Sequence, residues 1–223
     1  MDQALSTKAF KGPGMEGFTA KWYASLTRKS MDEFQKLARR VAGRMPSGGR
    51  VLEVAPGPGY FAIELAKLGN YDLTGLDISR TFVEIARRNA FEAGVRVDFR
   101  EGNASRMPFE NESFDFLLCR AAFKNFSDPA PALKEMYRVL KPGGQALIID
   151  LRRDAPQESI AEAVEQMHLG AVNSFITKMT FRFMLLKRAY TKGDFERMVA
   201  ETPFGAAEIR ENVVEMEIVL SKR

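Results

Sequence analysis

A glycine-rich segment with an acidic residue in front of it is the part of this sequence best suited to hold a ligand. Residues 53–59 read EVAPGPG and follow a short apolar run, so they are expected to join a strand to a helix. Glycines let a ligand approach the backbone closely, and the helix N-terminus offers unpaired N–H groups. The segment therefore indicates either a cofactor-binding loop or a tight turn that binds nothing.

Two classes of cofactor fit this loop. Gly57, Gly59 and Ala62 satisfy the spacing of a dinucleotide-binding loop, and Asp77 lies at the distance expected of an acid that binds a ribose. Glu53 favours the other class, because its carboxylate would repel a pyrophosphate but attract the ammonium and sulfonium groups of S-adenosylmethionine. No length is left over for a substrate domain of the dehydrogenase kind. These observations favour S-adenosylmethionine over NAD or FAD.

The elements that must position these residues alternate between strand and helix from residue 50 onward. Five short apolar runs predict strands, at residues 51–54, 71–76, 95–99, 114–119 and 146–151. Helices between them imply right-handed crossovers and a parallel sheet, which binds ligands at the carboxyl ends of its strands. Two further runs, 207–210 and 213–220, are so close together that they predict an antiparallel pair. We therefore expect a Rossmann-like α/β fold with a seven-stranded, mostly parallel sheet.

We expect the whole chain, residues 1–223, to form a single domain around this sheet. Helical spacing predicts an N-terminal helical cap over 1–46, followed by the strand–helix core over 50–151. Residues 155–201 predict a helical insertion after the fifth strand, and residues 205–223 contain the C-terminal strand pair.

Composition limits the class of protein. Lysines and arginines number 33 against 29 acids, a net charge of +4, and the absence of a concentrated basic run argues against nucleic acid as a partner. No segment resembles a leader peptide or a membrane span. Cys119 is the single cysteine, so no internal disulfide can form, which fits a reducing compartment. We expect a cytoplasmic protein that acts on a small molecule.

Five motifs in register carry a family resemblance. They are residues 51–59, 76–79, 102–104 with 107–109, 113–115 and 135–144. Together they resemble class I S-adenosylmethionine-dependent methyltransferases, above all the small-molecule branch that includes the ubiquinone and menaquinone methyltransferases. The resemblance implies S-adenosylmethionine as cofactor and methyl transfer to a small acceptor that is apolar or aromatic. An RNA methyltransferase, and a non-catalytic cofactor-binding regulatory protein of the same fold, are the alternatives.

The resemblance assigns cofactor contacts to residues that follow the first two predicted strands. Glu53 would hold the methionine ammonium, and Gly57 and Gly59 would line the methionine and ribose. Asp77 would accept hydrogen bonds from both ribose hydroxyls, with a helix-capping role as its alternative. Ile78 would pack on the adenine face.

Further contacts are implied elsewhere, with two departures from the family pattern. Asn103 stands where the family usually has Asp, and it would accept a hydrogen bond from the adenine amino group unless it only shapes a turn. The backbone of Ala104 would also contact adenine. Ala55 replaces a common glycine and leaves slightly less room. Arg120 would meet the cofactor carboxylate or form a plain salt bridge, and Tyr23 is also placed at the cofactor.

Methyl transfer from a sulfonium mainly requires alignment, because the leaving group departs neutral and needs no acid. A base is needed only if the acceptor carries a proton that must leave. His168, the single histidine, lies in the insertion, where the family places substrate residues, so it is the candidate catalytic base, with a purely structural role as the alternative. The family's usual histidines are absent from residues 123–126.

The insertion also contains an apolar stretch with basic residues, from Phe175 to Tyr190. The pattern predicts a helix that lies over its own domain as a lid. The same pattern also fits a wall of an apolar substrate pocket, a homodimer face or a contact with a membrane surface.

Overall fold

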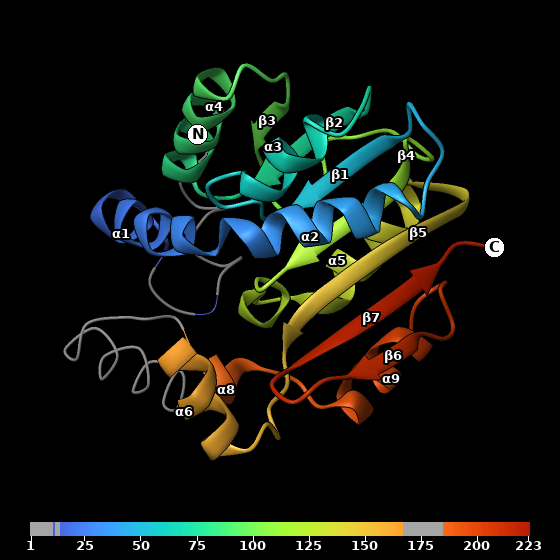
Figure 1. The fold of residues 1–223 in the computed structure, drawn as a ribbon. Coiled ribbons are helices and arrows are strands. Elements are labelled where there is room, and N and C mark those ends of the chain that lie inside the picture. Colours follow the sequence, from blue (N-terminus) through green and yellow to red (C-terminus); the bar gives the residue numbers. More distant parts are fainter. Residues whose placement is uncertain (1–10, 12–13, 167–184) are drawn as a thin grey trace.

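A seven-stranded sheet forms the centre of the structure, a computed structural model that describes residues 11, 14–166 and 185–223 (Figure 1). The strands run in the order β3-β2-β1-β4-β5-β7-β6. The first five strands pair in parallel, whereas β7 pairs antiparallel with β5 and with β6. The Rossmann-like fold predicted from the sequence is confirmed. The strand bounds are β1 Arg50–Val54, β2 Asp72–Asp77, β3 Asp98–Glu101, β4 Phe114–Arg120, β5 Leu140–Leu151, β6 Glu208–Glu211 and β7 Glu215–Ser221.

Helices cover both faces of the sheet. Apolar side chains of α2 and α3 pack against β1, β4 and β5 on one face, and α4 packs there beside β3. On the other face, α5 and α9 pack against β4, β5 and β7. The helices, with the short turns η1 and η2, are α1 Gly17–Thr27, η1 Arg28–Ser30, α2 Met31–Ala42, α3 Tyr60–Ala66, α4 Arg80–Glu92, η2 Phe123–Asn125, α5 Pro129–Val139, α6 Gln157–Gln166, α8 Leu186–Arg188 and α9 Lys192–Ala200.

Strand β7 shows how side-chain alternation selects this arrangement. Met216, Ile218 and Leu220 are fully buried and face α5 and α9. Glu217 points to the opposite face, where it pairs with Arg40 of α2 at 2.5 Å. Because successive side chains of a strand alternate between faces, the pattern fixes which side of β7 meets the core.

Two strands begin three or more residues away from the position that the sequence pattern predicts. β3 begins at Asp98 rather than at residue 95, because Gly94 adopts φ +67° and Val95 donates its N–H to the carbonyl of Ala90, which continues the turn after α4. β5 begins at Leu140 rather than at residue 146, since Leu140 already pairs with Phe114 across a register shift. Residues 141–144, in which Gly143 has φ 78°, are therefore an irregular part of β5.

Of the insertion expected over 155–201, the structure describes α6, α8 and α9. The candidate base His168 and the predicted helix over 175–190, up to residue 184, lie outside the described residues. In the part of the chain that is described, none of the helices has the length and apolar character needed to cross a membrane.

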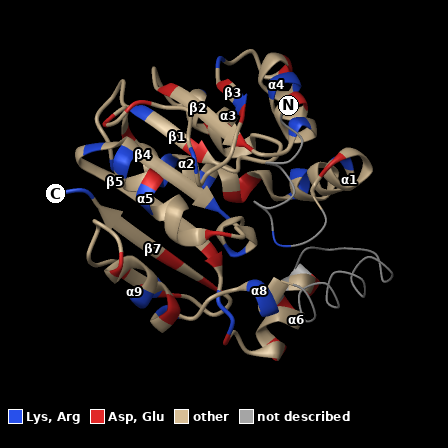
Figure 2. Cartoon of the chain, turned by 180° about the vertical axis from the view of Figure 1, so that it is seen from behind, with Lys and Arg blue, Asp and Glu red and all other residues tan. Residues whose placement is uncertain are grey.

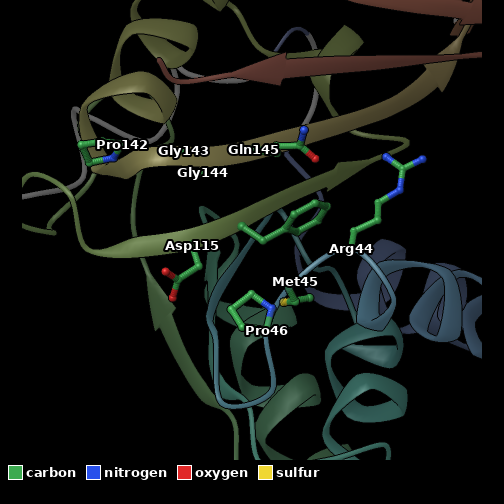
Figure 3. Close-up of a pocket in the computed structure, with 9 residues that line it drawn as sticks. Arg44, Met45, Pro46, Asp115, Pro142, Gly143, Gly144 and Gln145 are labelled. Carbon is green, nitrogen blue, oxygen red and sulfur yellow. The ribbon is translucent and has the colours of Figure 1, made fainter.

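A cavity of about 330 Å³ opens at the amino ends of β4 and β5 (Figure 3). Asp115 and Phe116 at the start of β4 line it together with residues 44–46 and 142–145. Asp115 is tied there to Lys141 by an ion pair of 2.8 Å and accepts the N–H of Arg50. Parallel sheets bind ligands at the opposite, carboxyl edge, so this cavity is not the candidate functional site.

Candidate active site

The loop after β1 contains three residues in the left-handed region of backbone conformation. Ala55 has φ 56°, Gly57 has φ 55° and Gly59 has φ 78°. Glycine adopts this conformation freely, whereas a residue with a Cβ atom is strained there by roughly 1–2 kcal/mol. The structure therefore explains why a glycine is common at position 55 in the family. Ala55 is held in place by its N–H, which donates to the carbonyl of Leu76 at 2.8 Å.

The two glycines of the loop are required for different reasons. A Cβ atom at Gly59 would lie 2.6 Å from Phe99 Cζ and 3.0 Å from Ala86 Cβ, so a side chain there would collide with the core. A Cβ atom at Gly57 would have nothing closer than the rings of Phe82 and Tyr23, at 4.0 Å. Gly59 thus permits close packing of the loop on β3 and α4, whereas Gly57 leaves the loop open on its outer side.

Asp77, the last residue of β2, holds the loop through its carboxylate. Oδ2 accepts the N–H of Gly57 at 2.9 Å, and Oδ1 accepts the N–H of Ser79 at 2.9 Å. Burial raises the pKa of Asp77 to about 6, against the lowering effect of these two donors, and nearby Glu16 raises it further. Each oxygen keeps a lone pair that can accept another hydrogen bond. The cap of α4 is Ser79, whose Oγ accepts the N–H of Phe82, so Asp77 shapes the turn before the helix and its contacts there are compatible with a ligand contact.

Glu53 is buried in β1, and its Oε2 accepts the N–H of Ala62 at 3.2 Å. Burial raises the pKa of Glu53 to about 8, and the charge of Asp77 acts in the same direction, while the charge of Arg120 lowers it. The sequence predicts an ionised carboxylate at Glu53, whereas its burial in the structure favours the neutral form unless a cation lies beside it.

Residues after β3 form a turn in which Asn103 already uses its side chain. Asn103 Oδ1 accepts the N–H of Ser105 at 2.8 Å, and its carbonyl accepts the N–H of Arg106 at 3.0 Å. Asn103 and Ala104 are both half-buried. The turn-forming interpretation of Asn103 is thus seen directly, because Oδ1, the atom expected to accept from the adenine amino group, accepts the N–H of Ser105. Ile78, after β2, is half-buried as well.

Arg120, at the end of β4, forms a salt bridge. Its Nη2 lies 2.9 Å from Glu33 Oε2 of α2, and its guanidinium lies 4.9 Å from the ring centroid of Phe34. Of the two interpretations of Arg120, the salt bridge is the one that the structure contains. Tyr23 of α1 packs edge-on against Phe82 of α4, with ring centroids 5.9 Å apart.

Comparisons with known proteins converge on one family. Residues 52–148 match a family model described as a methyltransferase domain. The demethylmenaquinone methyltransferase of Deinococcus radiodurans is 39% identical over 102 residues, which are 45% of this chain and 42% of that protein. The enzyme of the same name from Chlorobaculum tepidum is 34% identical over 136 residues, 60% of this chain and 54% of that protein. The chain spans about half the length of the curated relatives it matches.

The fold comparison covers almost the whole chain. The crystal structure of a proposed S-adenosyl-L-methionine-dependent methyltransferase from Methanococcus maripaludis aligns with a TM-score of 0.76 over 95% of each chain, at 22% identity. Residues 52–148 therefore carry a methyltransferase domain, and the chain has the fold of S-adenosylmethionine-dependent methyltransferases.

The methyltransferase domain has a buried ion pair that the sequence did not reveal. Lys124 Nζ lies 2.8 Å from Asp150 Oδ1, and the N–H of Lys124 donates to Asp150 Oδ2 at 2.8 Å. Lys124 Nζ also donates to the carbonyl of Ala121, which has φ 56°. The pair therefore fixes the sharp corner between β4 and η2. The sequence offered no clear sign of it, because Lys124 stands beside Asn125 and near Arg120, as a surface residue would.

A second group of polar residues near the candidate site comes from the two ends of the chain. Glu215 begins β7 opposite the end of β5, and burial raises its pKa, while the charge of Arg120 lowers it. Glu16, before α1, accepts the N–H groups of Arg80 and Thr81 at 3.1 Å each. No local motif marks either residue, because only the folded chain brings them to this edge of the sheet.

Proposed function

We propose that this protein transfers the methyl group of S-adenosylmethionine to a small acceptor that is apolar or aromatic. The observation that carries the proposal is the hydrogen bond from Gly57 to Asp77, inside a segment that matches a methyltransferase domain. Residues 1–223 would act as one domain, with 1–46 as an N-terminal cap, 50–151 as the cofactor-binding core, 155–201 as a lid and 205–223 as the C-terminal strand pair.

The residues of the loop fit the chemistry of this cofactor. Glu53 is a buried carboxyl group, and burial makes its ionised form unfavourable and raises its pKa. A neighbouring cation would offset this cost, and the methionine ammonium would be such a cation. Gly57 leaves the loop open where a Cβ atom would otherwise project. Asp77 would accept the ribose hydroxyls with lone pairs that the backbone donors leave free. Ala55 and Gly59 would shape the loop around the cofactor without contacting it through a side chain.

The remaining cofactor contacts are proposed on the basis of position. Ile78 would pack on adenine, and the turn at Asn103 and Ala104 would bind the edge of the base through amide and backbone groups. Tyr23 would close the methionine side. Arg120 would exchange its partner Glu33 for the cofactor carboxylate, a change that its half-buried guanidinium permits.

When bound, S-adenosylmethionine supplies an electrophilic methyl group on a sulfonium. The contribution of the chain is to exclude water and to hold the acceptor in line with the methyl group, because the leaving group departs neutral. Where the acceptor carries an acidic proton, His168 would take it. His168 lies outside the described residues, and its place in the insertion after β5 is what supports this role.

The class of acceptor is proposed from the relatives and from the sequence. Two relatives bear the name demethylmenaquinone methyltransferase, which supports an aromatic, apolar acceptor. We also propose a cytoplasmic location, supported by the lone buried Cys119, and a homodimer through the insertion as the assembly to test. RNA methylation and a non-catalytic regulatory role remain the competing functions, and each predicts a different result below.

Two measurements test the proposed function. S-adenosylhomocysteine should raise the melting temperature, since it binds the native state, and NAD should not. Methyl-labelled S-adenosylmethionine should then label a 1,4-naphthohydroquinone but not bulk tRNA. Stabilisation by NAD alone would refute the assignment of the loop. Labelling of tRNA would favour the RNA function, and cofactor binding without labelling of either acceptor would favour the regulatory role.

A further inference from the structure

Helix α1 exposes its large apolar side chains and buries its small ones. Ala20 and Ala24 are 0% and 7% exposed and face α4, whereas Phe18 is 82% exposed and Trp22 is 41% exposed. Residues four apart lie on the same face of a helix, so Phe18 and Trp22 form one outward row, which half-buried Leu26 extends. A helix that packs only on its own domain has the opposite pattern.

Along α1 and η1, all charged side chains are basic. No acidic residue occurs between Glu16 and Asp32, a stretch that contains Lys21, Arg28 and Lys29. Among the described residues, neither Lys21 nor Arg28 has an ion-pair partner, and both line a groove of about 200 Å³ between α1 and α4. Basic residues lie on both helices in Figure 2.

Arg88 of α4 adds a third cation to the groove. Arg88 forms an ion pair of 3.9 Å with Glu92, so Lys21 and Arg28 are the unpaired cations of the groove among the described residues. Exposed aromatic side chains beside unpaired cations are the features with which a helix lies in the interface of an anionic membrane. We call the surface formed by these residues the α1 face. It consists of Phe18, Trp22, Lys21, Arg28 and Arg88.

We propose that the α1 face docks on the surface of an anionic phospholipid bilayer. Phe18 and Trp22 enter the interface between headgroups and acyl chains, and the cations of the groove contact lipid phosphates. This inference goes beyond the proposed function and does not depend on the identity of the acceptor.

Charge decides against two other occupants of the α1 face. A two-fold dimer would place the same patch on both subunits, so that unpaired cations would face one another. The part of the insertion over residues 167–190 contains Lys178, Arg182, Lys187 and Arg188 and no acidic residue, so this part would also bring like charge to the cations of α1. An anionic bilayer instead complements both the charge and the aromatic row.

The position of the α1 face relates it to the candidate active site. Glu16, directly before α1, binds the first N–H groups of α4, next to Ser79 and Asp77. Tyr23, on the flank of the same helix, is with Phe82 one of the two side chains nearest to a Cβ atom placed on Gly57, both at 4.0 Å. Docking through α1 therefore holds the cofactor end of the domain beside the lipid surface.

Vesicle sedimentation with the full chain tests the proposal. We expect binding to vesicles of phosphatidylglycerol with phosphatidylcholine, weakened by added salt, and little binding to phosphatidylcholine alone. Replacing Phe18 and Trp22 together by Ser should weaken binding by at least about tenfold. The matched control is Val213→Ser, at a residue that is 63% exposed between β6 and β7, and it should bind as the native chain does.

A second pair of variants tests the charge. Lys21→Ser should weaken binding about fivefold, whereas Lys134→Ser, at an exposed lysine of α5, should not. Circular dichroism establishes that each variant is folded. Equal binding to both kinds of vesicle overturns the proposal, as does a Phe18/Trp22 variant that binds like Val213→Ser. Light scattering provides a further test. If the native chain is a dimer and the Phe18/Trp22 variant is a monomer, the α1 face binds a second copy of the chain, and the bilayer proposal is overturned.

Discussion

The N–H of Gly57 donates to Asp77 Oδ2 at 2.9 Å, and this bond joins the loop after β1 to the end of β2. The other oxygen of the same carboxylate accepts the N–H of Ser79, which begins the turn into α4. One side chain therefore orders two of the loops at the carboxyl edge of the sheet. Any change at Asp77 must alter the shape of these loops as well as the contacts of Asp77 with a ligand.

Replacing Asp77 by Asn should weaken the binding of S-adenosylhomocysteine by about 2 kcal/mol. The reason is that Asn offers one acceptor oxygen where Asp offers two, and its NH₂ group would face a backbone donor. The free energy of unfolding should fall by about 1 kcal/mol, since the fold itself rests on the buried sheet. Titration calorimetry measures the affinity, and urea denaturation measures the stability.

Asp115→Asn is the matched control for that variant. Asp115 also accepts a backbone N–H, that of Arg50, but it lies at the amino end of β4, away from the loop. This variant should lose some stability and keep its affinity for S-adenosylhomocysteine. Unchanged affinity in a folded Asp77→Asn protein would remove Asp77 from the cofactor site.

Glu53 should make cofactor binding depend on pH. Burial raises the pKa of Glu53 to about 8, so near neutral pH the carboxyl group of the free protein is mostly protonated. The ammonium of a bound ligand favours the ionised form, and binding should therefore release close to one proton. Calorimetry at neutral pH in buffers with different ionisation enthalpies measures that proton. Glu53→Gln should abolish the release, and a proton count near zero in the native chain would contradict the proposed contact.

The same pKa predicts how stability varies with pH in the absence of ligand. The pKa of Glu53 in the folded chain, about 8, exceeds its ordinary value of 4.5. The folded state therefore keeps a proton that the unfolded chain loses, and stability falls as pH rises from 4.5 to about 8. Glutamine does not ionise, so the Glu53→Gln variant lacks this loss of stability with rising pH. The free energy of unfolding of the variant minus that of the native chain should therefore increase from pH 4.5 to about 8 and then level off. Thermal melting at several pH values measures the difference.

Gly57→Ala and Gly59→Ala should separate backbone conformation from packing. Both positions have positive φ, so each substitution should cost roughly 1–2 kcal/mol of stability through strain. Only Gly59→Ala should add a clash with Phe99, worth about 1–3 kcal/mol more. Gly57→Ala should instead mainly weaken binding of S-adenosylhomocysteine. Equal stability of the two variants would contradict this division.

Local patterns in the sequence predicted those features that depend on a few neighbouring residues. The strand β1, the loop over 55–59 and the acid at the end of β2 follow from apolar runs and glycine spacing, and the structure contains them. The start of β5 at Leu140 was missed, because its pairing with Phe114 is a contact between distant segments. Pairing across a register shift leaves no signal in the alternation of residues.

The polar partners at the site were harder to predict for the same reason. The salt bridge from Arg120 to Glu33 joins residues 87 positions apart, and the contact of Glu16 with Thr81 joins residues 65 positions apart. Charged residues in helices usually face solvent, so the sequence offered no reason to select these two acids. The outward aromatic row of α1 was missed because its spacing is helical, and helical spacing alone does not say which face is buried.

The buried pair of Lys124 and Asp150 should be essential for stability but not for cofactor affinity. Lys124→Met would leave Asp150 as an uncompensated buried charge, which costs about 3–5 kcal/mol. The double variant Lys124→Met with Asp150→Leu should recover a large part of that loss, because it removes both charges. Urea denaturation of the single and double variants measures the coupling. A double variant that is no more stable than Lys124→Met would show that Lys124 acts through Ala121 rather than through the ion pair.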